Sequence, residues 1–219
     1  MFGRLLDLLF PPKCAFCRTV TDGARVCAAC MDSLPRTAGA DRDAGGDFLD
    51  GCVTPLRYAG TVRDSIHRFK FGGLSCYAPA YAALLAPAVR ERLQDRIDVI
   101  AWVPVSRRRR RERGYDQAQL LAQELAKQLD LPYERLLLRT RNTAANSSLQ
   151  GAEKRRANVA GAFQAIPERA AGRRILLADD VYTTGATMSE CARMLLMAGA
   201  ESVHGAAVAR AGEKPEAGG

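Results

Sequence analysis

Apolar residues follow two recurring patterns along this chain, and the first is a short run without polar alternation. The clearest runs are residues 175–178 and 98–105. A strand covered on both faces has this pattern, because neither face needs polar side chains. Residues 52–58 are expected to form an edge strand, since Pro55 would interrupt a central ladder. Further strands are predicted at residues 161–166 and 202–209.

The second pattern places apolar residues three or four positions apart, which predicts helices. Residues 62–71 carry three such side chains on one face and are followed by the helix-breaking pair Gly72-Gly73. Other helices are predicted at residues 77–93, after residues 114–117, and from Met188 onward. Strands that alternate with helices predict an α/β fold, with a mostly parallel sheet and helices on both of its faces.

Two adjacent acids, Asp179 and Asp180, follow the apolar run 175–178. In open α/β sheets, ligands bind at the carboxyl ends of the strands. After Val181 and Tyr182, the loop that follows consists of Thr183, Thr184, Gly185, Ala186 and Thr187. A glycine allows positive φ, so backbone N–H groups in such a loop turn into one concavity. The loop leads into a helix N-terminus, where unpaired donors and the helix dipole favour a phosphate.

The acids and the threonine loop favour different parts of one ligand. Two carboxylates repel phosphate but accept hydrogen bonds from the vicinal hydroxyls of a sugar. A ribose 5-phosphate unit offers both hydroxyls and phosphate. The alternative is a strand followed by an ordinary N-capped helix, in which Asp and Thr are common caps. One cap does not require two acids and three threonines, so we favour the sugar phosphate.

Residues 174–187 resemble the phosphoribosyl pyrophosphate (PRPP) loop of the type I phosphoribosyltransferases. The shared pattern is an apolar strand, two acids, an aliphatic residue and a Thr/Gly loop. The resemblance implies that Asp179 and Asp180 hold the ribose hydroxyls and that residues 183–187 hold the 5-phosphate. Several purine-salvage members have an Asp where this chain has Thr183, and that Asp works on the incoming base. Its absence argues against an ordinary purine salvage role.

Composition and charge narrow the class of partner. The 219 residues are 47% hydrophobic, enough for one α/β domain with a small appendage. There are 32 Lys and Arg against 24 Asp and Glu, a formal net charge of +8, which indicates phosphorylated metabolites or nucleic acid as partners. No apolar run approaches the roughly 18 residues of a membrane span. Residues 1–10 read as a short amphipathic helix without a signal-peptide pattern, so we expect a cytoplasmic protein.

Two C-x2-C pairs lie near the N-terminus with nine residues between them; they are Cys14, Cys17, Cys27 and Cys30. Four thiolates at this spacing suit a tetrahedral Zn²⁺ ion in a closed structural site. Disulfides are the poorer alternative in a reducing cytoplasm, and a redox role would need only one pair. Because this segment buries little apolar surface alone, metal binding is expected to order it. The single cysteines Cys52, Cys76 and Cys191 are expected to be buried hydrophobes.

Residues 106–113 hold six arginines and one acid directly after the predicted strand 98–105. The patch is either a solvated basic surface, a nucleic-acid site, or a pyrophosphate site beside the phosphate loop. For the pyrophosphate, Arg107, Arg111 and Arg113 are the candidates. Lys70, just before Gly72-Gly73, is either an anion ligand or a solvated helix end.

The segment Val-Pro-Val-Ser-(Arg)5-Glu-Arg-Gly-Tyr-Asp-Gln at residues 103–117 resembles the ComF family of competence proteins. Residues 139–143 and 155–163 and the four cysteines agree with that family, so the resemblance covers about residues 5–210. It implies that residues 139–158 form a flexible loop able to close over PRPP, where the sequence alone indicates a surface loop. It also implies a link to DNA uptake during natural transformation.

These observations predict a zinc-binding module at residues 1–35, a linker at 36–50, a phosphoribosyltransferase-like domain at 51–212 and a disordered tail at 213–219. The expected activity is PRPP-dependent glycosyl transfer with Mg²⁺, held mainly by pyrophosphate and ribose oxygens, to an acceptor that the sequence does not identify. Two alternatives stay open. One is a PRPP-responsive binding protein without turnover, and the other is a protein that binds single-stranded DNA on the arginine patch.

Overall fold

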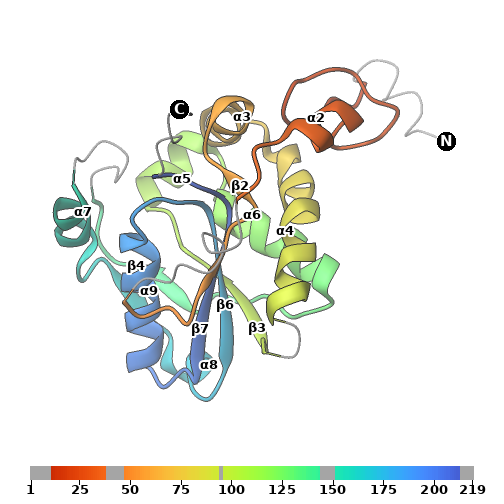
Figure 1. The fold of residues 1–219 in the computed structure, drawn as a ribbon. Helices are drawn as coiled ribbons and strands as arrows, with labels where there is room; N and C mark the ends of the chain where they lie inside the picture. Colours follow the sequence, from red (N-terminus) through yellow and green to blue (C-terminus); the bar gives the residue numbers. More distant parts are fainter. Residues whose placement is uncertain (1–10, 38–46, 94–95, 144–150, 213–219) are drawn as a thin grey trace, which may run out of the picture.

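We analysed a computed structural model that describes residues 11–37, 47–93, 96–143 and 151–212 (Figure 1). Within these residues, five strands form a parallel sheet in the order β1-β7-β6-β3, and β2 also pairs with β7. The strands are β1 (Cys52–Val53), β2 (Leu56–Arg57), β3 (Val99–Trp102), β6 (Arg174–Tyr182) and β7 (Ser202–Arg210). The predicted α/β class with a mostly parallel sheet is therefore confirmed.

Helices cover both faces of the sheet, as expected for fully buried parallel strands. One face packs against α3 (Gly60–Phe71), α4 (Ala78–Leu93) and α6 (Gln117–Leu129), with the short helix η2 (Ser75–Tyr77) before α4. The other face packs against α9 (Ala186–Met197). Figure 1 shows α4 and α6 on one side of β6 and β7 and α9 on the opposite side. Two separate apolar cores result, one on each side of the sheet.

Alternation along β6 assigns its side chains to these two cores. Leu176 and Ala178 belong to the α4–α6 core, whereas Ile175 and Leu177 belong to the α9 core. The edge strand predicted at 52–58 is present as β1 and β2 beside β7. Its hydrogen bonding is interrupted around Pro55, as the missing proline N–H requires.

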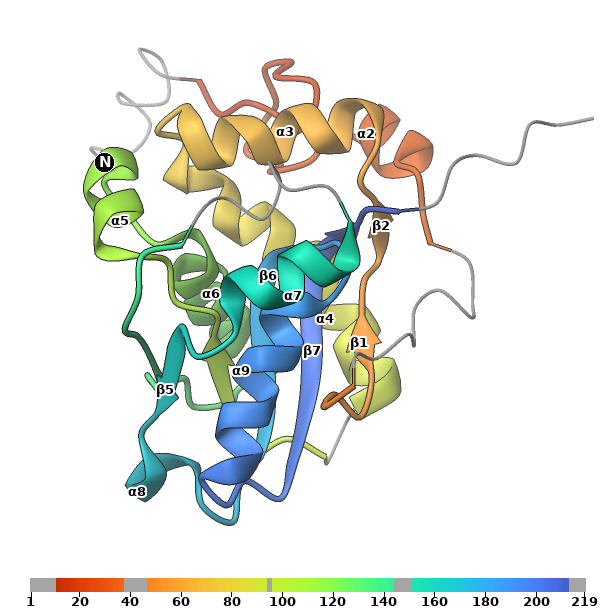
Figure 2. The same ribbon diagram turned by 90° about the vertical axis from the view of Figure 1, so that its left-hand side faces the viewer.

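The remaining elements lie around the carboxyl and outer sides of the sheet. Strands β4 (Leu137–Arg139) and β5 (Phe163–Ala165) form an antiparallel pair, and α7 (Ala152–Val159) lies between them in sequence. Figure 2 shows β5, α7 and α9 on the same face of the molecule. The short helices are α2 (Ala28–Ser33), α5 (Arg107–Arg113) and α8 (Pro167–Ala170).

Four sequence predictions need correction. β6 extends to Tyr182, so Asp179 and Asp180 lie inside the strand, because β7 continues to pair with it through Arg210. The helix predicted from Met188 already begins at Ala186. Residues 161–166 supply β5, which pairs with β4 and not with the main sheet. The predicted loop 139–158 contains most of helix α7.

Two smaller outcomes concern single cysteines and the chain ends. Cys52 and Cys191 are buried as predicted, whereas Cys76, on η2, is exposed. The helix expected at 1–10 and the tail expected at 213–219 lie outside the described residues. No described helix combines the length and apolar character that crossing a membrane requires.

Candidate functional site

The junction of β6 and α9 forms the centre of the candidate site. Thr183, Thr184 and Gly185 connect the two elements, and Gly185 has a φ of +73°. A Cβ atom on Gly185 would lie 2.3 Å from the Tyr182 hydroxyl oxygen, so a side chain there would force the Tyr182 ring to shift and would also be strained by the backbone angle. The predicted positive φ at this glycine is confirmed. The turn delivers the chain directly into the first residues of α9.

Hydrogen-bond donors gather at this turn. Among the described residues, no side chain caps the N-terminus of α9. The Thr184 hydroxyl oxygen is buried and, among the described residues, has no hydrogen-bond partner. Thr187 lies in the first turn of α9. Donors and helix dipole together make this turn suitable for a phosphate group.

The two acids face different surroundings although they are adjacent. Alternation along β6 directs Asp180 to the α4–α6 side and Asp179 to the α9 side. Asp180 is buried, and its Oδ1 lies 2.7 Å from Nζ of Lys70, the residue before the last of α3. An Oδ1 atom of Asp179 accepts the backbone N–H of Asp180 at 2.8 Å. Lys70 is thus an ion-pair partner of the site and not a solvated helix end.

Burial raises the pKa of Asp179 well above its usual range, to about 8, and the negative charge of Asp180 adds to the shift. Lys70 opposes the shift, and the more distant Asp116 adds to it. Asp116 is itself buried, which raises its own pKa. Lys70 pairs with Asp180, whereas the cation that opposes the shift of the Asp116 pKa is Arg110. With its pKa raised to about 8, Asp179 tends to hold a proton near neutral pH.

The arginines of residues 107–113 are helical and not in a loop. Ser106 begins α5 by accepting the Arg109 backbone N–H, and Gly114, at a φ of +81°, ends it. Arg107 and Arg111 are exposed. Arg113 is half-buried. Its Nη1 donates to Gln117 Oε1 at 2.8 Å, and its guanidinium lies 4.8 Å from the centre of the Phe71 ring.

Two arginines that were not among the predicted site residues lie together beside Thr143. Burial lowers the pKa of Arg139, at the end of β4; the charge of Arg109 of α5 lowers it further, and the charge of Asp179 opposes the shift. Both are half-buried. Arg139 Nη1 also lies 3.5 Å from the Pro104 carbonyl oxygen, in the turn that follows β3. The sequence did not predict this arrangement, because Arg109 and Arg139 are far apart along the chain and only the fold brings β4 beside that turn.

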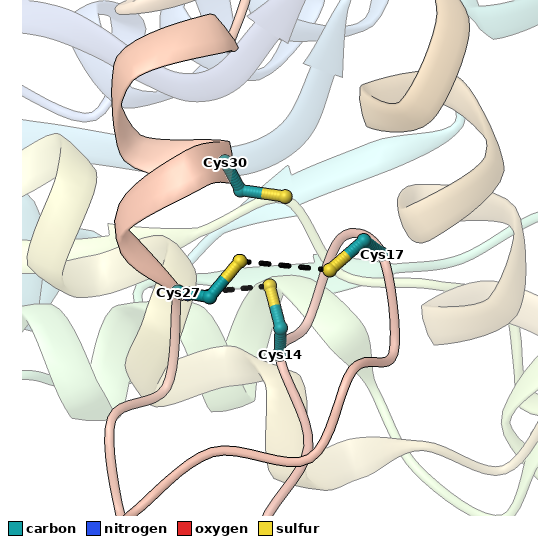
Figure 3. A group of neighbouring side chains, drawn as sticks. All are labelled: Cys14, Cys17, Cys27 and Cys30. Atoms are coloured by element: carbon teal, nitrogen blue, oxygen red, sulfur yellow. Dashed lines mark hydrogen bonds between the residues drawn. The ribbon is translucent and has the colours of Figure 1, made fainter.

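The four cysteines of the N-terminal segment come together as predicted (Figure 3). Their sulfur atoms all lie within 4.8 Å of one another, and Cys17 Sγ is 3.6 Å from Cys27 Sγ. Tetrahedral Zn–S bonds of about 2.3 Å place sulfurs about 3.8 Å apart, so the cluster fits a zinc ion with little adjustment. The Cys27 backbone N–H donates to Cys14 Sγ at 3.4 Å, as thiolate ligands commonly accept.

The first cysteine pair is anchored in the main core. Between Cys14 and Cys17, Ala15 and Phe16 are almost fully buried, and the Phe16 ring meets Tyr81 edge-on at 5.9 Å. From α3, Ser65 Oγ donates to the Ala15 carbonyl at 2.6 Å, and Arg68 Nη2 donates to the Phe16 carbonyl at 2.6 Å. The four-cysteine segment therefore packs against the same helix that carries Lys70.

Comparison with known proteins agrees with both parts of the structure. Residues 5–41 match the double zinc ribbon domain, and residues 116–217 match the phosphoribosyl transferase domain. Over 160 residues the chain is 36% identical to the DNA utilization protein YhgH of Escherichia coli K12, covering 69% of this chain and 68% of that protein. This chain belongs to the ComF family.

Two further relatives of this ComF protein carry competence names. Competence protein F of Haemophilus influenzae is 35% identical over 153 residues, which cover 67% of this chain and 66% of that protein. Competence protein ComFC of Bacillus subtilis is 32% identical over 144 residues, covering 65% and 56%. The resemblance stated from the sequence is thus confirmed, together with the zinc-ribbon module and the phosphoribosyltransferase fold of the ComF protein.

Proposed function

We propose that this protein binds PRPP across the carboxyl ends of β3 and β6. The observation that carries the proposal is the turn between β6 and α9. It has an uncapped helix N-terminus, a glycine at positive φ, and a buried Thr184 hydroxyl that has no hydrogen-bond partner among the described residues. An anion is the ligand that satisfies these donors. In this proposal the residues that hold the 5-phosphate are Thr183, Thr184, Gly185, Ala186 and Thr187.

The acids next to this turn would orient the ribose. A protonated Asp179 carboxyl donates to one hydroxyl oxygen, while Asp180 accepts from the neighbouring hydroxyl. Val181 continues the strand beside them and fixes the spacing between the acids and the loop. Lys70 would release Asp180 and turn toward the pyrophosphate when sugar hydroxyls replace the ion pair.

The leaving pyrophosphate needs positive charge on the side of β3. Lys70 and the α5 arginines Arg107, Arg111 and Arg113 are the candidates for stabilising the charge that builds up as the glycosidic bond breaks. Mg²⁺ would be held mainly by pyrophosphate and ribose oxygens, with water completing its coordination. When bound, Mg²⁺ supplies neutralisation of the pyrophosphate charge. In the transfer, the bond between ribose C1 and a pyrophosphate oxygen would break and the pyrophosphate would leave. C1 would bond to the acceptor, which loses a proton.

The names of the relatives suggest a role in DNA uptake or utilisation for this chain too. One observation favours single-stranded DNA as a second candidate ligand. The Phe71 ring is 62% exposed, lies under the Arg113 guanidinium and is 4.8 Å from the His67 ring. An exposed aromatic ring beside cations is a stacking platform for bases. Loss of DNA affinity in Phe71→Ala, with PRPP affinity unchanged, would assign DNA to the Phe71 ring. Loss of both affinities would indicate that the two ligands share the neighbouring Arg113.

The experiment that tests the PRPP proposal combines binding with turnover. Calorimetric titration with PRPP and Mg²⁺ is expected to show binding by the parent protein and a loss of more than tenfold in the double variant Asp179→Asn, Asp180→Asn. Asp64→Asn is the matched control, because Asp64 is an exposed acid on α3. Equal affinity in all three proteins would refute the proposed site.

Pyrophosphate release in the presence of a small-molecule cell extract then separates enzyme from sensor. Release that needs both the extract and the two aspartates establishes a transferase, and fractionation of the extract identifies the acceptor. Binding of PRPP without release would instead favour a PRPP-responsive protein that switches an interaction.

A further inference from the structure

Two arginine side chains from different elements meet on the α9 side of the sheet, near the turn after β3. Arg109 of α5 donates from Nη2 to the Thr143 carbonyl oxygen at 3.2 Å. Arg139 of β4 donates from Nη2 to the hydroxyl oxygen of the same threonine, and from Nη1 to the Pro104 carbonyl at 3.5 Å. Arg139 also lies over the Phe163 ring, 5.0 Å from its centre. Both guanidinium groups are therefore fixed in position.

In the part of the chain that the structure describes, neither arginine has an acidic partner. Among the residues that the structure describes, no carboxylate lies within ion-pair distance of Arg109 or Arg139. The neighbouring Arg108, by contrast, is exposed and pairs with Glu112 at 2.7 Å. Burial lowers the pKa of both half-buried arginines, and the charge of Arg109 lowers that of Arg139 further. Two partly desolvated cations that repel each other are an unfavourable arrangement unless an anion joins them.

A purely structural role explains only part of this arrangement. Arg139 ties residues 141–143 to the turn after β3, and carbonyl and hydroxyl oxygens satisfy it for that purpose. The tie does not need a second guanidinium, because Arg109 adds to it only one hydrogen bond among the described residues, to the carbonyl of the same threonine. A shared oxyanion would require both arginine side chains, because planar guanidinium groups bind oxyanions through paired N–H donors.

We propose that Arg109 and Arg139 form a binding site for an oxyanion group, a phosphate, pyrophosphate or carboxylate. The site lies on the opposite side of the sheet from Lys70, because Lys70 contacts Asp180 whereas Arg139 lies over the Phe163 ring, which belongs to the α9 core. If the proposed PRPP function holds, the anion is either the pyrophosphate of PRPP or an acidic group of the acceptor. The second source would restrict the unknown acceptor to anionic compounds.

The test uses inorganic pyrophosphate as the probe, so that it does not depend on PRPP turnover. Calorimetric titration of the full chain is expected to show pyrophosphate binding that weakens at least tenfold in both Arg109→Gln and Arg139→Gln. Arg108→Gln, on the same helix, should bind like the parent protein. If both site variants keep the parent affinity, or if Arg108→Gln weakens binding equally, the proposed site is wrong and the binding reflects general basic charge.

Thermal unfolding without ligand guards against a folding artefact. Removing one of two repelling cations should leave the melting temperature of Arg109→Gln unchanged or raise it at low salt. A lowered melting temperature combined with parent-like pyrophosphate affinity would show that the pair is only structural.

Titration with PRPP then identifies the source of the anion. A parallel loss of PRPP affinity assigns the site to its pyrophosphate, and an unchanged PRPP affinity assigns it to the acceptor.

Discussion

Replacement of Phe16 by alanine tests whether the zinc-ribbon module is a structural part of the phosphoribosyltransferase-like domain. Phe16 lies between two of the four cysteines, yet its side chain is only 2% exposed and packs in the core beneath α3. A metal module attached by a flexible linker would not depend on such a contact. The substitution leaves all four cysteines in place, so it separates packing from metal binding.

The expected cost follows from what the ring contacts. Truncation of a buried phenylalanine to alanine typically costs about 3–5 kcal/mol of unfolding free energy, from lost transfer energy and the cavity left behind. The edge-on contact with Tyr81 accounts for about 0.5–1.5 kcal/mol of this. For a chain of this size the change corresponds to a fall in melting temperature of roughly 10 °C.

The assay is denaturant and thermal unfolding of the parent protein and Phe16→Ala, with zinc content measured on both. Phe48→Ala is the matched control, because Phe48 is 42% exposed and its loss should change stability by no more than about 0.5 kcal/mol. Zinc content should be the same in all three proteins, since the ligands are untouched. A cost below about 1 kcal/mol for Phe16→Ala, with zinc retained, would refute the claim that the module is docked in the core.

The other predictions concern the site itself. Because the pKa of Asp179 is raised on folding, wild-type stability should fall as the pH rises from about 4 to 8, and Asp179→Asn should remove this fall in a melting series across pH. Gly185→Ala should cost about 1–3 kcal/mol and abolish PRPP binding, whereas Gly114→Ala, also at positive φ but in open space, should keep PRPP affinity. Lys70→Met should cost of the order of 3 kcal/mol in chemical unfolding, because it leaves Asp180 buried without a cation.

The sequence was most informative where one pattern decides the structure alone. Continuous apolar runs predicted β3 and β6, and the proline at 55 predicted the interrupted edge strand. The length of β6 was underestimated because two adjacent acids, Asp179 and Asp180, interrupt its apolar run, and the residues after Ala178 stay in the strand through pairing with β7. That pairing is a tertiary contact, which local pattern does not contain.

Short polar helices were the main omission, for a similar reason. None of the residues of α5 is buried, so no apolar periodicity marks it. Its only sequence signals are the flanking Ser106 and Gly114, which supply the N-cap and the left-handed C-terminal residue. Helix α7 likewise has little amphipathic character. For such elements the capping residues are better evidence than hydrophobic spacing.

The candidate site was predicted where its residues are adjacent and missed where they are distant. One continuous segment contains Asp179, Asp180 and the threonine loop, so their proximity could be predicted without knowledge of the fold. Arg139 lies 40 positions before Asp179 on a different sheet, and its proximity follows only from the position of β4 beside the turn after β3. The sequence allowed two roles for Lys70, an anion ligand or a solvated helix end, and the fold shows that Lys70 contacts Asp180.

The two ends of β3 and β6 show how the same residue types serve stability at one end and binding at the other. At the amino end, Asp98 and Arg174 form paired hydrogen bonds, and these lower the pKa of Asp98 to about 2. At the carboxyl end, burial raises the pKa of Asp179 while Arg139 lies without an acidic partner among the described residues. An acid and an arginine that were selected only for stability would pair there too. That they stay apart, beside an uncapped helix N-terminus, is what a site kept open for an anionic sugar ligand requires.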